Sequence, residues 1–181
     1  MSKAVLFFAD GTEECEALLV ADLLRRAKVE VIIASAMGRR ALVSSHGIHL
    51  NADALAEDVD YSDVDMVILP GGIPGTPNLA ENKTVTDTCV SFAKAGKKVA
   101  AICAAPFILG ELDLLEGRHA TCFPGFEKSF PEGAYTGEKV TQDGNIITAS
   151  GMAQSLPFAL ELLRTIAGDK AVEKVAEGIQ L

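Results

Sequence analysis

The sequence predicts an α/β fold, a sandwich in which a mostly parallel sheet carries helices on both faces. Short apolar runs alternate along the chain with segments that have apolar residues at helical spacing, which is typical of βαβ units. The runs are apolar throughout, as expected for strands that are buried on both faces. The 181 residues are enough for one sizeable core, so we predict a single domain over residues 1–181.

In the first half of the chain, apolar runs predict core strands at residues 3–8, 29–34 and 64–69. A helix is expected from Glu13 onward, with one apolar face formed by Ala17, Val20, Ala21 and Leu24. Residues 39–52 predict a small antiparallel hairpin, because apolar triplets flank the polar segment 44–47. The hairpin is therefore an addition to the sandwich, at its edge or facing a partner.

In the second half, further strands are expected at residues 98–102, 120–123 and 145–149. Helices are expected at about 82–95 and 169–178, with Gly96 placed to cap the first of these. Two more helices are predicted by apolar residues at helical spacing: Ile108, Leu112 and Leu115 in one, and Ala159, Leu162, Leu163 and Ile166 in the other, which Ser155 would cap.

Composition excludes several classes of protein. The formal net charge is −9, and the basic residues occur only singly or as isolated pairs, which argues against a nucleic-acid surface. The longest apolar stretch, Val99–Leu109, falls well short of the ~18 residues that suggest a membrane span. The N-terminus has no secretory pattern, so we expect a cytoplasmic protein.

The four cysteines, at positions 15, 89, 103 and 122, form no close pair. In a reducing compartment they are expected to be free thiols. The spacing gives no basis for a structural zinc site, and we expect neither a metal nor an organic cofactor.

Ligands of open α/β sheets bind in a crevice at the carboxyl ends of the strands. The residues that directly follow the predicted strands are therefore the candidates for a functional site. Cys103 stands where a buried strand turns abruptly into a helix. A helix N-terminus would lower the pKa of its thiol from ~8.5 towards 7.5 or below. The alternative is a buried cysteine that acts as a small hydrophobic residue. Ser150 and Gly151 follow another strand and are secondary candidates.

Glu16 is the second candidate, one turn into the first helix. If it points into the crevice, burial raises its pKa, and thiol and carboxyl then compete for one proton. The alternative is an ordinary first-turn glutamate favoured by the helix dipole, as we expect for Glu13 and Glu14. Gly71 and Gly72 could offer backbone N–H groups to an oxyanion, or could simply form a turn.

Four motifs, in order and at these spacings, resemble the ThiJ/PfpI superfamily and specifically its DJ-1-like branch. The resemblance covers nearly the whole chain. The motifs are Gly11-Thr12-Glu13-Glu14-Cys15-Glu16, Val67-Ile68-Leu69-Pro70-Gly71-Gly72, Val99-Ala100-Ala101-Ile102-Cys103-Ala104-Ala105-Pro106 and Thr148-Ala149-Ser150-Gly151.

The resemblance implies a flavodoxin-like three-layer sandwich and a homodimer. It implies that Cys103 is a nucleophile-elbow cysteine, that Glu16 is its acidic partner, and that Gly72 and Ala104 supply backbone amides. The branch is linked to oxidative-stress defence, with glutathione-independent conversion of methylglyoxal to lactate and a disputed protein deglycase activity. The partners would then be small reactive aldehydes or peroxide. The alternative is a redox sensor or chaperone without turnover, in which Cys103 is oxidised to sulfenate and sulfinate.

The sequence departs from its relatives at two positions. Ala104 stands where protease-like relatives have His, which argues against peptidase chemistry. Phe123 stands where some DJ-1-like proteins have a His that could move a proton. His46 falls where some relatives have Arg, so an anion-binding role is conceivable. Cys15, beside Glu16, is a candidate to resolve a sulfenic acid on Cys103.

Overall fold

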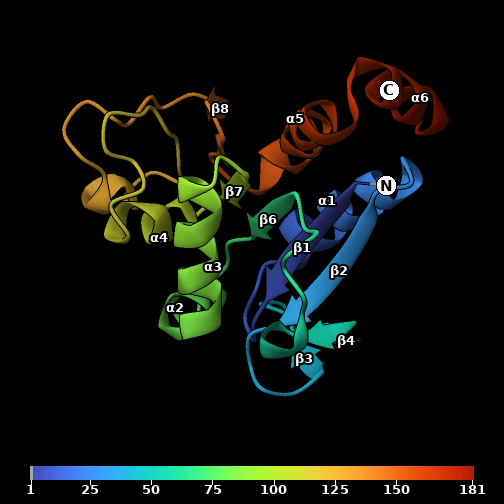
Figure 1. Cartoon of the computed structure of the whole chain (residues 1–181), viewed down its shortest axis with the longest axis horizontal. Helices are drawn as coiled ribbons and strands as arrows, with labels where there is room; N and C mark the ends of the chain where they lie inside the picture. The colour runs from blue at the N-terminus through green and yellow to red at the C-terminus, as the bar shows by residue number, and fades with distance from the viewer. Residues whose placement is uncertain (1) are drawn as a thin grey trace.

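A computed structural model gives the structure of residues 2–181, so Met1 of the predicted domain lies outside the described residues. A seven-stranded sheet runs through the protein in the order β5-β2-β1-β6-β7-β9-β8. Figure 1 labels its strands β2, β1, β6, β7 and β8. Its strands are parallel except β8, which runs antiparallel to β9. The bounds are β1 Lys3–Phe8, β2 Glu30–Ser35, β5 Ala54–Leu55, β6 Met66–Leu69, β7 Lys98–Ile102, β8 Val140–Asp143 and β9 Ile146–Ala149.

Helices cover both faces of this sheet, as the sequence predicts (Figure 1). The first face carries α1 (Glu14–Arg26), α5 (Ser155–Ala167) and α6 (Asp169–Gly178), which pack on a core that includes Leu6. The second face carries α2 (Gly75–Glu81), α3 (Lys83–Lys94) and α4 (Pro106–Glu111), which pack on a core that includes Val5 and Phe7. Successive residues of β1 thus point to opposite layers, which explains why the strand is apolar from Ala4 to Phe8. The predicted flavodoxin-like three-layer fold is confirmed.

The predicted hairpin at residues 39–52 is also confirmed. Strands β3 (Ala41–Val43) and β4 (His49–Asn51) pair antiparallel in a sheet of their own. Leu42 is buried in the core shared with α1 and β1. His46 lies in the turn between the two strands.

The prediction of a strand at residues 120–123 was wrong. This segment makes only an isolated bridge between Ala120 and Tyr135. The amide of Thr121 instead donates to the Thr148 hydroxyl at 2.8 Å, and the amide of Phe123 donates to the Cys103 carbonyl at 2.7 Å. These bonds use the donors that a ladder would need, and the sheet is extended by β8 instead.

The ends of two helices are also placed differently. Helix α4 ends at Glu111, so Leu112 and Leu115 lie beyond it. Asp113 adopts a left-handed conformation with φ 56°, and the Leu114 amide bonds to the Leu109 carbonyl, which closes the helix with a Schellman motif. Ser155 does not cap α5, because its hydroxyl donates to the Met152 carbonyl of the 3-10 turn Met152–Gln154.

By contrast, Gly96 follows α3 as predicted. It has φ +72°, and the next amide, of Lys97, bonds back to the Phe92 carbonyl. Among the helices of residues 2–181, none combines the length and apolarity needed to cross a membrane.

Candidate active site

Cys103 forms a sharp turn between β7 and α4, at the carboxyl end of the central strands. Its φ is +64°, a left-handed conformation that is uncommon for a residue other than glycine. Its amide donates to the Ala149 carbonyl of β9 at 2.9 Å, and its carbonyl accepts from the Phe123 amide at 2.7 Å. These bonds on both sides hold the strained residue in place. The thiol is half-buried, as expected for a group that meets a small reactant.

Glu16 reaches the same place from the first turn of α1. Glu13 caps this helix by accepting from the Glu16 amide at 2.7 Å, and Glu16 itself is fully buried. Oε2 of Glu16 accepts from the Gly71 amide at 2.8 Å, whereas Oε1 is buried and has no hydrogen-bond partner among residues 2–181. A buried carboxylate oxygen without a partner is costly, which favours the protonated acid.

Gly71 separates the two side chains. A Cβ at this position would lie 2.7 Å from the Cβ of Cys103 and 2.7 Å from Oε2 of Glu16. The thiol-bearing residue and the carboxyl group therefore flank one small space that only glycine leaves open. The structure thus brings the Glu16 carboxyl group and Cys103 together, while their action as a pair stays a prediction.

The pKa values of the pair are shifted strongly. Burial raises the pKa of Glu16 to about 7, against smaller lowering effects of hydrogen bonds with Cys103 and the Gly71 amide. Burial, together with the charge of Glu16 and its hydrogen bond, raises the pKa of Cys103 to about 12. The amides of Ala104 and Gly72 lower the pKa of this thiol, but by less.

The direction for Cys103 is the opposite of what the sequence argument predicts. Helix α4 has only six residues and begins at Pro106, three positions after the cysteine, so its dipole is weak there. The ionised carboxyl group nearby also disfavours a second negative charge. Thiol and carboxyl together form a coupled pair that keeps one proton in the neutral range.

Two backbone amides face the sulfur, those of Gly72 and Ala104. Gly72 has φ +92°, and a Cβ there would lie 2.6 Å from the Gly11 carbonyl oxygen. Gly71 was also predicted to offer its amide to an oxyanion, but this N–H donates to Glu16 instead. The amides that remain free to face an anion at the sulfur are therefore those of Gly72 and Ala104, while the Gly71 amide binds the carboxyl group; anion binding by the first two stays a prediction.

The secondary candidates lie around this pair. Phe123, Ser150 and Gly151 line one open cavity of about 400 Å³ together with Met152, but Cys103 does not line it. A Cβ on Gly151 would lie 3.3 Å from the Phe123 ring. Cys15 is exposed on α1, and because successive side chains of a helix point in different directions, it does not follow Glu16 into the site. Its role as a resolving thiol stays a prediction.

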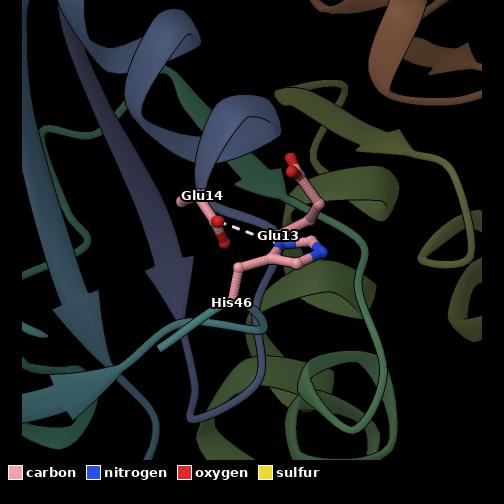
Figure 2. A group of neighbouring side chains, drawn as sticks. All are labelled: Glu13, Glu14 and His46. Carbon is pink, nitrogen blue, oxygen red and sulfur yellow. Dashed lines mark ion pairs between the residues drawn. The ribbon is translucent and has the colours of Figure 1, made fainter. Parts of the chain in front are cut away.

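His46 and Glu14 link the hairpin to α1 (Figure 2). The Nδ1 atom of His46 lies 2.9 Å from Oε1 of Glu14, and the Ser45 hydroxyl donates to Oε2 at 3.1 Å. Burial raises the pKa of Glu14, but hydrogen bonds from its own amide and from Ser44 and Ser45, with the charge of His46, lower it overall. Glu14 is therefore more than a first-turn glutamate, a role that its sequence position could not reveal.

The same cluster contains possible metal ligands. One ligand atom each of Glu13, Glu14 and His46 lies within 4.8 Å of the others (Figure 2). Glu13 already caps the α1 amide of Glu16, and both oxygens of Glu14 have partners in the hairpin. Glu14 and His46 therefore stabilise the contact between α1 and the hairpin, whereas Glu13 stabilises the first turn of α1.

Comparison with known proteins gives consistent matches over the whole chain. The family model described as DJ-1/PfpI family matches residues 2–165. Protein dj-1beta of Drosophila melanogaster is 35% identical, covering 99% of this chain and 97% of the relative. The glutathione-independent glyoxalase DJR-1.2 of Caenorhabditis elegans is 26% identical, covering 99% and 96%.

Solved structures agree with this match. The oxidized DJ-1 of Toxoplasma gondii superposes with a TM-score of 0.95 at 30% identity, covering 99% of this chain and 98% of that one. A mutant of a DJ-1 superfamily protein from Salmonella typhimurium gives a TM-score of 0.94 at 36% identity, with the same coverage. The motifs, the fold and these relatives lead to one conclusion: the chain belongs to the DJ-1/PfpI family.

Proposed function

We propose that this protein is a cysteine-dependent enzyme of carbonyl-stress defence that converts methylglyoxal to lactate without glutathione. The observation that carries the proposal is the buried Glu16 carboxyl group, which has a pKa of about 7 and flanks Gly71 together with Cys103. A general acid and base is most effective when its pKa lies near the working pH. The relative named as a glutathione-independent glyoxalase supports the same chemistry.

The reaction begins when the Cys103 sulfur attacks the aldehyde carbon. As the carbon–sulfur bond forms, the thiol proton passes to the Glu16 carboxylate, and the carbonyl electron pair moves onto the oxygen. The amides of Gly72 and Ala104 stabilise this oxyanion, which then takes up the proton from Glu16.

Proton transfer between the two carbons completes the chemistry. Glu16 removes the proton from the former aldehyde carbon and delivers it to the neighbouring carbonyl carbon, while the hydroxyl proton passes from the first oxygen to the second; this leaves a lactoyl thioester on Cys103. Water then cleaves the thioester, and lactate leaves while the thiol is restored. Phe123 cannot transfer a proton, so Glu16 performs each proton transfer alone. The Cys103 nucleophile could also act on glycated amines, and the protein would then be a deglycase.

A second candidate function is redox sensing. Peroxide would oxidise the Cys103 thiol to sulfenate and then to sulfinate, with release of one water at each step. The observation that favours it is the unpartnered Oε1 of Glu16, since a protonated carboxyl could donate from this atom to an oxygen on the sulfur. The amides of Gly72 and Ala104 suit the same sulfur oxygens.

We further propose a cytoplasmic homodimer. The reactive thiol needs a reducing compartment. Ile48 of the hairpin is 47% exposed and Leu18 of α1 is 37% exposed, so both can contribute apolar area to a two-fold contact. Sedimentation of reduced protein at micromolar concentration tests this, and a single species of 19.0 kDa would contradict it.

Lactate formation from methylglyoxal without glutathione tests the main proposal. We expect turnover by the reduced protein, none by Cys103→Ser, and unchanged turnover by Cys89→Ala. Cys89 is the matched control, because it lies on α3 with its thiol buried in the core of the second face, whereas Cys103 packs against the core of the first face. No turnover by verified reduced protein would refute the enzyme, and peroxide-dependent mass gain on Cys103 would then support the sensor.

A further inference from the structure

An apolar cavity of about 270 Å³ lies between α2, α4 and the segment that follows Phe123. Its walls are mainly Ile73, Pro77, Ala80, Phe107 and Phe126. Ile73 is 56% exposed, which is high for a large apolar residue. An apolar hollow that is open to solvent can receive an apolar group of a ligand.

Short backbone connections join the cavity to both anion-binding amides. The carbonyl of Gly72 accepts from the amide of Thr76, which lines the cavity. The carbonyl of Ala104 accepts from the amide of Phe107, the aromatic wall on α4. Each residue that presents an N–H group to the sulfur thus binds a residue of the cavity through its carbonyl.

A third connection comes from the other side of Cys103. Its carbonyl accepts from the Phe123 amide, and the Phe123 ring packs edge-to-face on the Phe126 ring with centroids 6.4 Å apart. Three segments of chain thus join residues around Cys103 to residues that line the cavity, although Cys103 itself does not line it.

We propose that this cavity binds a bulky apolar substituent of the electrophile that Cys103 attacks. Resting on the proposed function, the preferred substrates are then 2-oxoaldehydes with an aromatic or branched aliphatic group, ahead of methylglyoxal. The size is suitable, because an apolar cavity of about 150 Å³ is enough to hold benzene. One methylene group in an apolar pocket is worth about 10- to 200-fold in kcat/KM, so a phenyl group in this half-open cavity should give at least about tenfold.

The first test compares phenylglyoxal with methylglyoxal. We expect the ratio of their kcat/KM values to be at least about tenfold in the wild type and to fall towards one in Ala80→Leu, which fills the cavity. Ala176→Leu is the matched control, because Ala176 is also a half-buried helical alanine but lies on α6, in the opposite layer. This control should keep the wild-type ratio.

The second test does not depend on turnover. The rates at which iodoacetamide and its N-phenyl derivative alkylate Cys103 are measured. In both reactions the carbon–sulfur bond forms, iodide leaves, and the thiol proton passes to solvent. The ratio of the alkylation rate constant for the N-phenyl derivative to that for iodoacetamide is divided by the same ratio measured with glutathione, a thiol without a pocket. We expect a corrected ratio well above one in the wild type and Ala176→Leu, and a ratio near one in Ala80→Leu.

The two tests separate this inference from the proposed function. Turnover of methylglyoxal without any preference for phenylglyoxal would overturn the inference and leave the glyoxalase proposal intact. No aldehyde turnover, with a raised alkylation ratio that Ala80→Leu removes, would refute the glyoxalase and support the cavity. A corrected alkylation ratio near one in the wild type overturns the inference in every case.

Discussion

Replacing Glu16 by glutamine should change how the stability of the protein depends on pH. Glutamine has nearly the same shape and can still accept from the Gly71 amide, but it carries no ionisable proton. The carboxyl group it replaces is fully buried, and its Oε1 has no partner among residues 2–181. The Glu16→Gln variant therefore removes one titration and leaves the packing nearly intact.

The sign and size of the effect follow from the two pKa values. In the folded protein the pKa of Glu16 is about 7, against 4.5 in an unperturbed chain, so the folded state binds the proton more tightly. This contribution to stability is complete below pH 4.5 and is lost as the pH rises through 7. The difference corresponds to about 3 kcal/mol of unfolding free energy. Relative to the wild type, Glu16→Gln should therefore gain about 3 kcal/mol between acid and weakly alkaline pH.

Urea unfolding of both reduced proteins over a series of pH values measures this difference directly. Subtracting one curve from the other cancels the remaining titrating groups that the two proteins share. The Cys103→Ser variant is a useful control, since it keeps Glu16 and should retain most of the wild-type pH dependence. A difference between Glu16→Gln and the wild type that stays constant from below pH 4.5 to above pH 7 would refute the reasoning.

Three further predictions concern the same region. The kcat/KM for methylglyoxal should rise with pH through about 7 as the Glu16 carboxylate forms, and a pH–rate profile without an inflection there would contradict its role as base. Gly71→Ala places a Cβ 2.7 Å from both Cys103 and Glu16. We expect urea unfolding to show an unfolding free energy lowered by about 1–3 kcal/mol, and most lactate formation to be lost, whereas an active and equally stable variant would count against this packing. Thr76→Val removes a hydroxyl that is buried without a partner among residues 2–181, and it should raise the unfolding free energy by about 1 kcal/mol; a loss of stability would show that the hydroxyl has a partner.

The elements that the sequence predicts well are those whose apolar pattern is set by two-sided burial. Strands β1, β6, β7 and β9 are short apolar runs, and α1, α3 and α5 have clear apolar faces. Strand β8 was missed because it is an edge strand with the half-exposed polar sequence Val-Thr-Gln-Asp, although the Asp143-Gly144 turn that follows it is a typical hairpin pattern.

Helix α2 was missed for a different reason. Its seven residues include Gly75 and Pro77, which have low helix propensity. Tertiary contacts hold it instead: the Asn78 side chain donates to the Asp10 carbonyl, and a Cβ on Gly75 would lie only 2.5 Å from the Thr12 amide nitrogen. Local sequence does not contain the information about these contacts.

The position of Cys103 at the candidate site could be predicted from the order of the elements, because it requires only that ligands bind at the carboxyl ends of parallel strands. Its meeting with Glu16 could not be derived in this way, since the two residues lie far apart in the sequence and nothing local indicates which face of α1 meets β7. The family resemblance supplied that pairing. The direction of the thiol pKa was wrong because the local argument counted the helix but left out the burial and the carboxyl group, which come from tertiary structure.

The pKa values themselves bear on the choice between enzyme and sensor. A thiol with a pKa of about 12 is a poor nucleophile by itself at neutral pH, so it needs a base that accepts its proton as it reacts. Glu16 can accept that proton at no great cost only because its own pKa is raised to about 7. In the reaction with an aldehyde, the proton passes from Glu16 to the aldehyde oxygen, and product release restores the Cys103 thiol and the Glu16 carboxylate. Oxidation instead leaves a lasting negative charge on the sulfur oxygens, which the two amides and the protonated Glu16 must stabilise. A pair that shares one proton thus supports turnover, provided that the substrate reaches the sulfur before peroxide does.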